Sequence, residues 1–146
     1  MRVLFDTCVV LDALQAREPF REDAEKLFLA VANERINGML TEKSITDIYY
    51  LTHRLTHSDR RTREILMNLL TLFDLVDTTG NDCRQALLSE LPDYEDAVMA
   101  EAAVREELDC IVTRNLHDYR KAACKVLSPS ELLELLIDRN ADIDQE

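Results

Sequence analysis

The sequence contains 146 residues, of which 47% are hydrophobic, so extensive disorder is excluded and one folded domain is expected. Only 2 glycines and 3 prolines occur, which argues against an all-β architecture with many tight turns. The 17 basic and 29 acidic residues give a net charge of −12, which argues against nucleic-acid binding by the surface as a whole. The same balance suits a protein that gathers carboxylates around a cation.

The predicted elements alternate between strands and helices. The apolar residues 3–5 predict a buried strand of a parallel sheet, which ends abruptly at Asp6. The periodicities that follow predict a helix at 20–33, a strand at 36–40, a helix from Ser44, a helix at 60–72, an edge strand at 73–76, a helix at 81–89, a helix from Asp93, strands at 110–113 and 125–127, and a last helix capped by Ser128. We therefore predict one α/β domain over residues 1–137 with a mainly parallel sheet, and a polar, acidic tail at 138–146 that frays.

The cysteines and the hydropathy pattern indicate the compartment. Cys8, Cys83, Cys110 and Cys124 form no C-x-x-C pair, and neither an apolar signal segment nor a run of about 20 apolar residues occurs. We therefore predict a cytoplasmic protein whose cysteines are reduced and serve mostly as small core residues. Cys8, close to Asp6, is a much weaker candidate for a nucleophile, because no histidine lies near it in the sequence.

Acidic residues recur where predicted strands end or the next helix begins. Asp6 follows the first strand, Asp47 lies in the first turn after the second, Asp96 opens the helix before the fourth, and Asp118 follows the fourth. Carboxyl ends of parallel strands meet at one edge of a sheet, where open α/β sheets place their ligands. Carboxylates gathered there repel one another, and a divalent cation removes that cost. Ligands that are all oxygen favour Mg²⁺ or Mn²⁺.

Each acid also has a purely structural interpretation. Asp6 can cap the following helix, and Ser44 with Asp47 has the spacing of a capping box. Asp93 can be the N-cap of the helix that contains Asp96, and the spacing from Asn115 to Asp118 suits an Asx turn. The four placements together favour the metal site over four separate structural roles.

Several segments resemble the motifs of the PIN domain family. They are LFDTCVVLD at 4–12, SITDIYY at 44–50, DYEDAV at 93–98, IVTRNLHDY at 111–119 and VLSP at 126–129. The resemblance extends over nearly the whole chain. It implies a three-layer α/β/α sandwich and a Mg²⁺- or Mn²⁺-dependent ribonuclease. Many members are VapC-type toxins, which are dimeric and are held inactive by an antitoxin.

The resemblance also implies roles for individual residues. The metal ligands would be Asp6, Asp96 and Asp118. Asp47 would be the fourth catalytic acid at a helix position where the family usually has Glu, and Glu42 is a rival for that role. Polar support around the site would come from Thr113, Asn115 and Asp93. Cys8 stands where Asn or Ser is common, and Asp12 is interpreted as a surface or capping residue.

A basic segment provides the candidate contacts to RNA. Residues 53–63 form the densest basic run, so the predicted substrate-binding residues are Arg54, Arg60 and Arg61, with Arg114 beside the Asp118 loop. A solvated helix face without a ligand is the competing interpretation of this run.

Two other functions compete with the nuclease. A PIN-like domain that has lost activity would bind RNA or a protein partner, but the acids are mostly present here. A phosphoacceptor domain of the receiver type would need a second acid beside Asp6 and a Lys after the last strand, and that pattern is missing. The apolar residues Tyr49, Tyr50 and Leu51 cannot all face one core, and the resemblance implies that some of them lie in a homodimer contact.

Overall fold

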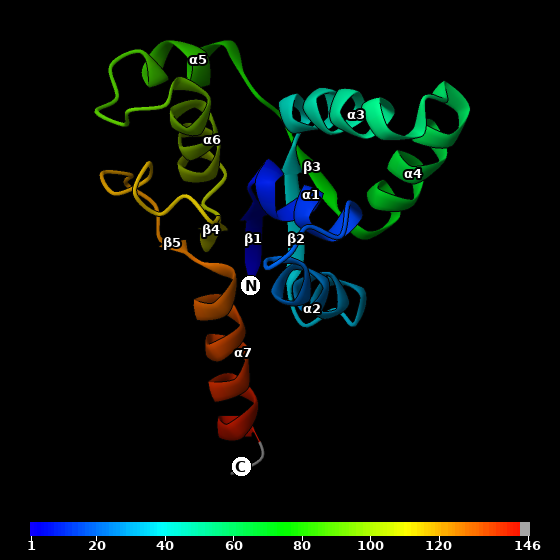
Figure 1. Ribbon diagram of the computed structural model, residues 1–146. Coiled ribbons are helices and arrows are strands. Elements are labelled where there is room, and N and C mark those ends of the chain that lie inside the picture. Colours follow the sequence, from blue (N-terminus) through cyan, green and yellow to red (C-terminus); the bar gives the residue numbers. More distant parts are fainter. Residues whose placement is uncertain (144–146) are drawn as a thin grey trace.

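The protein is described here by a computed structural model that covers residues 1–143 (Figure 1). Its elements in chain order are β1 (Arg2–Phe5), α1 (Thr7–Leu14), α2 (Arg21–Ala32), β2 (Asn37–Thr41), α3 (Glu42–Thr56), α4 (Asp59–Leu72), β3 (Asp74–Val76), α5 (Gly80–Ala86), α6 (Tyr94–Arg105), β4 (Cys110–Val112), β5 (Val126–Leu127) and α7 (Pro129–Ile143). Each strand predicted from the sequence is present within two residues of its predicted bounds. In residues 1–143, no helix is both long and apolar enough to span a membrane.

The five strands form one parallel sheet in the order β3-β2-β1-β4-β5. The first strand lies at its centre, where Leu4 pairs with Met39 of β2 on one side and with Ile111 of β4 on the other. The edge position of β3 is confirmed. Central strands of a parallel sheet are covered on both faces, which explains why β1 and β4 are apolar without alternation.

Successive residues of the central strands enter two different cores. Val3 and Phe5 pack with residues of α1, α2, α4 and α7, whereas Leu4 packs with residues of α6. Helices therefore cover both faces of the sheet, and Figure 1 shows α5 and α6 on the side opposite to α1 and α2. The predicted three-layer α/β/α sandwich is confirmed.

One glycine is required by the packing of the first core. A Cβ atom at Gly38 of β2 would lie 2.6 Å from the ring of Phe73 and 2.9 Å from the side chain of Val31. The Phe73 ring also makes an edge-to-face contact with Phe5, with ring centroids 5.0 Å apart. The absence of a side chain at position 38 thus lets Phe73 reach the centre of the sheet.

Three helices differ from the sequence prediction in their limits, and the helix predicted at 81–89 is α5, which ends at Ala86. The predicted helix from Ser44 begins at Glu42, because Thr41 is its N-cap and accepts a hydrogen bond from the Ser44 backbone N–H. The last helix is capped as predicted, with reciprocal hydrogen bonds between Ser128 and Glu131. It continues to Ile143, so residues 138–143 of the predicted tail are helical, and residues 144–146 lie outside the described part.

Candidate functional site

Asp6 is held at the carboxyl end of the central strand. It occupies the N-cap position of α1, but its side chain makes no capping hydrogen bond. Instead the hydroxyl of Thr113, directly after β4, donates to Asp6 Oδ2 at 2.7 Å. The carboxylate is buried, and burial raises the pKa of Asp6 although the hydrogen bonds from Thr113 and its neighbours oppose the shift. This carboxylate has a neutral donor but no cationic partner among the ion pairs of residues 1–143.

Asp96 lies opposite Asp6, in the first turn of α6. Asp93 is the N-cap of this helix and accepts a hydrogen bond from the Asp96 backbone N–H at 3.0 Å. The hydroxyl of the buried Tyr119 donates to Asp96 Oδ1 at 3.0 Å. Burial raises the pKa of Asp96 from 3.8 to about 7, and the charge of Asp6 adds to this effect. The charges of Asp93 and Asp118 act in the same direction.

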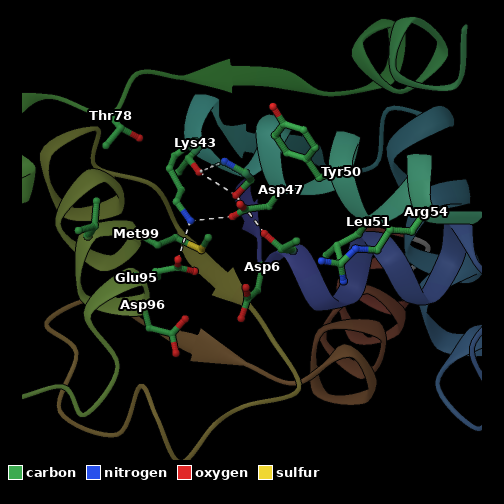
Figure 2. Close-up of a pocket in the computed structure, with 14 residues that line it drawn as sticks. Asp6, Lys43, Asp47, Tyr50, Leu51, Arg54, Thr78, Glu95, Asp96 and Met99 are labelled. Carbon is green, nitrogen blue, oxygen red and sulfur yellow. Dashed lines mark hydrogen bonds and ion pairs between the residues drawn. The ribbon is translucent and has the colours of Figure 1, made fainter. Parts of the chain in front are cut away.

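An open pocket of about 360 Å³ joins these acids to the start of α3. Asp6, Asp47 and Asp96 all line it, together with Lys43 and Arg54 (Figure 2). The pocket lies where β1 and β2 end and where α1, α3 and α6 contribute their first turns or flanking residues. The structure therefore brings together three of the four predicted catalytic acids in one cavity.

A lysine connects two walls of this pocket. The Lys43 ammonium donates to Asp47 Oδ2 at 2.7 Å and lies 2.9 Å from Glu95 Oε1, as the dashed lines in Figure 2 show. Burial lowers the pKa of Lys43, but the hydrogen bonds to Asp47 and Glu95 outweigh it, so the pKa is raised and the lysine stays charged. The capping box predicted for Ser44 and Asp47 is wrong, because Thr41 is the N-cap and Asp47 binds Lys43 instead.

The remaining predicted site residues have different surroundings. Asp118 is near enough for its charge to raise the pKa of Asp96, but it does not line the pocket. Asn115 is exposed, and its backbone N–H donates to the Thr113 hydroxyl at 3.0 Å. Glu42, the rival of Asp47, accepts a hydrogen bond from the Thr78 backbone N–H at 3.1 Å. Its carboxylate is thus used to fix the loop after β3.

The predicted RNA contacts separate into three groups. Arg54 lines the pocket, whereas Arg60 and Arg61 lie at the exposed start of α4 and do not line it. Arg114 is bound by Asp12, with distances of 2.6 and 3.2 Å between its guanidinium and the carboxylate. Asp12 is only 1% exposed, so its interpretation as a surface or capping residue is wrong.

Sequence reasoning missed Lys43, Glu95 and Tyr119. The spacing of four residues between Lys43 and Asp47 is a signal for an ion pair on one helix face. Glu95 and Tyr119 belong to the quoted motifs, but the sequence contains no indication that they reach Lys43 and Asp96. These contacts join segments 52 and 23 positions apart, and they depend on how α3 and the loop after β4 pack against α6.

The donor set of the pocket fits a divalent cation that keeps most of its water. In residues 1–143, no three Asp, Glu, His or Cys side chains form a group ready to hold a metal ion. Mg²⁺, however, is commonly bound through one or two carboxylates together with waters and substrate phosphates. Asp6 and Asp96 supply such a pair, and after burial the charge of Asp6 is the main cause of the raised pKa of Asp96. Cys8 does not add a suitable ligand, because Mg²⁺ prefers oxygen to sulfur; burial and the charge of Asp6 raise the pKa of this thiol to about 11.

Comparison with known proteins connects the sequence of the chain to a family and its fold to solved structures. The family model of the PIN domain matches residues 2–117. No curated protein matched the chain. Among solved structures, VapBC2 from Rickettsia felis, bound to a DNA fragment, has a TM-score of 0.65 at 16% identity over 88% of this chain and 98% of its own. A toxin-antitoxin complex from Klebsiella pneumoniae has a TM-score of 0.64 at 20% identity, with coverage of 87% and 97%.

A third similar structure is the sarcin-ricin loop cleaving toxin VapC20 from Mycobacterium tuberculosis. Its TM-score is 0.59 at 15% identity, and the alignment covers 75% of this chain and 86% of VapC20. Identities this low establish a shared fold, and the residues of the pocket must support any function by themselves.

Proposed function

Since the chain belongs to the PIN domain family, we propose that it is a Mg²⁺- or Mn²⁺-dependent endoribonuclease that hydrolyses phosphodiester bonds of RNA. One observation carries the proposal. Asp6 and Asp96 share a pocket, neither forms an ion pair within residues 1–143, and burial together with their mutual repulsion raises the pKa of Asp96 to about 7. Such an arrangement costs stability unless a cation binds, and strongly perturbed pKa values in a cleft are typical of functional sites.

The residues of the pocket would have different roles in such a reaction. Asp6 and Asp96 would hold the cation, with Thr113 and Tyr119 fixing the orientation of their carboxylates through hydrogen bonds of 2.7 and 3.0 Å. The bound cation would neutralise the phosphate and lower the pKa of the attacking water. Asp47, whose carboxylate is held by Lys43, would align this water. Asp118 would add negative charge close to Asp96.

RNA must approach a chain of net charge −12, so local positive charge has to guide it. Arg54 is the predicted substrate contact that lines the pocket, one helical turn beyond Tyr50 on α3. Arg60 and Arg61 lie beyond the end of α3 and would contact the RNA backbone outside the pocket. Arg114 is bound to Asp12, so we assign it a structural role and not contact with the substrate.

We further propose that the protein forms a homodimer and is the toxin of a toxin-antitoxin pair. Exposed apolar side chains lie close together on α3 and α4, among them Tyr50, Met67 and Leu70. Light scattering is expected to give twice the monomer mass at micromolar concentration. Met67→Glu should yield a monomer, and Leu29→Glu, at an equally exposed leucine on α2, should leave the dimer intact. A wild-type monomer would contradict the dimer.

The decisive experiment for the nuclease is cleavage of single-stranded RNA by the wild type and by Asp96→Asn, with Mn²⁺ and with EDTA. The substitution keeps the shape of the side chain and removes a charge that holds the cation. We expect a loss of about 100-fold or more, since a metal contributes several kcal/mol to the stabilisation of the transition state. Asp138→Asn on the exposed face of α7 is the matched control. Equal cleavage by wild type and Asp96→Asn would refute the proposal, and absence of any cleavage would favour a domain that only binds RNA or protein.

A further inference from the structure

Lys43 is the cation whose ammonium touches acids on two different elements of the pocket. It binds Asp47 on its own helix and Glu95 at the start of α6, at 2.7 and 2.9 Å. Each of these two acids therefore shares a positive charge, in contrast to Asp6 and Asp96. The pocket as a whole thus contains four carboxylates and one fixed ammonium, all labelled in Figure 2.

The backbone that carries Lys43 is fixed on both sides. Thr41 caps the helix through a hydrogen bond from the Ser44 backbone N–H, and the Thr41 and Ser44 hydroxyls are 2.8 Å apart. Glu42 is bound by the Thr78 backbone N–H of the loop after β3. Ser44 is buried, and its hydroxyl accepts a hydrogen bond from Thr7 at 3.2 Å. The first turn of α3 is therefore joined to α1 and to the β3 loop, which fixes the backbone position from which the Lys43 side chain enters the pocket.

An ion pair on an open surface would carry no functional meaning, because such pairs form and break easily in water. The Lys43 side chain is 41% exposed and that of Glu95 is 70% exposed, so what distinguishes Lys43 from such pairs is its location. Lys43 lines the cavity that Asp6 and Asp96 also line, and its ammonium contacts acids from two separate helices there. In nucleases with two cations, the second ion helps to stabilise the charge of the phosphate that reacts.

We propose that Lys43 takes the place of a second divalent cation: its ammonium neutralises Asp47 and Glu95, faces the phosphate of the bound RNA, and limits the pocket to one metal ion. This inference rests on the proposed nuclease function. It assigns Lys43 as a substrate-binding residue. It also predicts that removal of the lysine charge changes the metal stoichiometry and not only the rate.

The first test counts bound metal without any RNA. Mn²⁺ titrations, followed by electron paramagnetic resonance and by calorimetry, are made with wild type, Lys43→Met and Lys43→Arg. Wild type and Lys43→Arg should bind one Mn²⁺ per chain, whereas Lys43→Met should bind a second, since Asp47 and Glu95 are then free to bind a cation. Lys26→Met is the control. It breaks an exposed ion pair with Glu22 on α2, far from the pocket residues in the sequence, and this variant should still bind one Mn²⁺ per chain.

The second test concerns the phosphate. Binding of a single-stranded RNA oligonucleotide is measured by fluorescence anisotropy in EDTA, where cleavage stops, over a series of salt concentrations. Loss of one phosphate contact should reduce the slope of log affinity against log salt concentration by about 0.7 in Lys43→Met. Lys43→Arg should keep the slope of the wild type, and so should Lys26→Met.

The outcomes separate this inference from the proposed function. If wild type cleaves RNA but binds two Mn²⁺, or if Lys43→Met still binds one, the inference is overturned and the nuclease remains. An unchanged salt slope in Lys43→Met would overturn the contact to phosphate. If neither protein binds Mn²⁺, the metal site fails, and the proposed function and the inference fall together.

Discussion

Two buried aspartates at the ends of helix α1 have opposite surroundings. Asp12 is 1% exposed, and the guanidinium of Arg114 binds both of its oxygens while lying 3.9 Å over the ring of Phe20. Asp6 is 6% exposed, accepts from the neutral hydroxyl of Thr113, and shares a pocket with the acid Asp96. One carboxylate is provided with its own cation, and the other is placed beside a second negative charge.

This difference distinguishes a structural acid from a functional one. Burial of a charge costs free energy unless a partner compensates it. Asp82 follows the pattern of Asp12, since it is buried and bound by Arg105 at 3.0 Å. Within residues 1–143, Asp12 and Asp82 form ion pairs and Asp6 does not, which favours a position of negative potential of the kind that a metal site requires.

Substitution of Asp12, the structural acid of the pair, should have the largest effect on stability. Asp12→Asn keeps the volume of the side chain but leaves Arg114 without an anionic partner, so we expect the free energy of unfolding to fall by about 3 kcal/mol. Urea denaturation followed by circular dichroism measures it. Glu22→Gln, which breaks an exposed pair with Lys26, should leave the urea midpoint unchanged. An equal, small change in both variants would mean that the Asp12 pair is not structural.

Asp96, the acid that shares the pocket with Asp6, should behave in the opposite way. The pKa of Asp96 is about 7 in the folded chain and 3.8 in its ordinary state, so the folded chain keeps a proton that the unfolded chain has released. Without metal, this contribution to stability is present below pH 4 and is lost as the pH rises through about 7. Asp96→Asn should therefore equal the wild type in stability near pH 4 and be the more stable protein near pH 8, where the wild type has lost this contribution.

Thermal melts of both proteins across this pH range, in EDTA, measure the difference. Addition of Mn²⁺ should then reverse the order at the higher pH, because the metal stabilises only the protein that binds it. A wild type that remains the more stable protein at every pH without metal would contradict the assignment of Asp96 as an uncompensated acid.

The hydrogen bond from Tyr119 allows a finer test of the surroundings of Asp96. Tyr119→Phe removes the hydroxyl that donates to Asp96 Oδ1 and keeps the buried ring. We expect a loss of about 1 kcal/mol in stability. The pKa of Asp96 should rise further, because this hydrogen bond lowers it. The pH profile of RNA cleavage should therefore shift to higher pH, and a profile that is lower but not shifted would indicate a merely structural role.

The smallest effect is expected among the arginines. Arg54→Ala removes a positive charge from the pocket and should reduce the salt slope of RNA binding by about 0.7, measured by anisotropy in EDTA. Arg60→Ala with Arg61→Ala should weaken RNA binding and its salt dependence without changing Mn²⁺ affinity. A larger loss in the double variant than in Arg54→Ala would place the main RNA contact outside the pocket.

The fold could be predicted from local sequence because its determinants are local. The apolar residues 3–5 and 110–112 have no polar alternation, and only a strand buried on both faces tolerates that pattern. Helix starts with a strong cap, such as Ser128 with Glu131, were predicted correctly. The start of α3 was not, since Thr41 and Ser44 are both good caps and the packing of Ser44 against Thr7 decides between them.

The sequence by itself determined which acids follow strands, and the parallel order of the strands then brings Asp6, Asp47 and Asp96 to one edge. Only the tertiary structure decided which charges meet there. Ion pairs such as Arg114 with Asp12 and Lys43 with Glu95 join residues 102 and 52 positions apart. The attraction between charges acts through space and leaves no periodic signal along the chain, so the pairing of Asp12 with Arg114 and of Lys43 with Glu95 depends on packing.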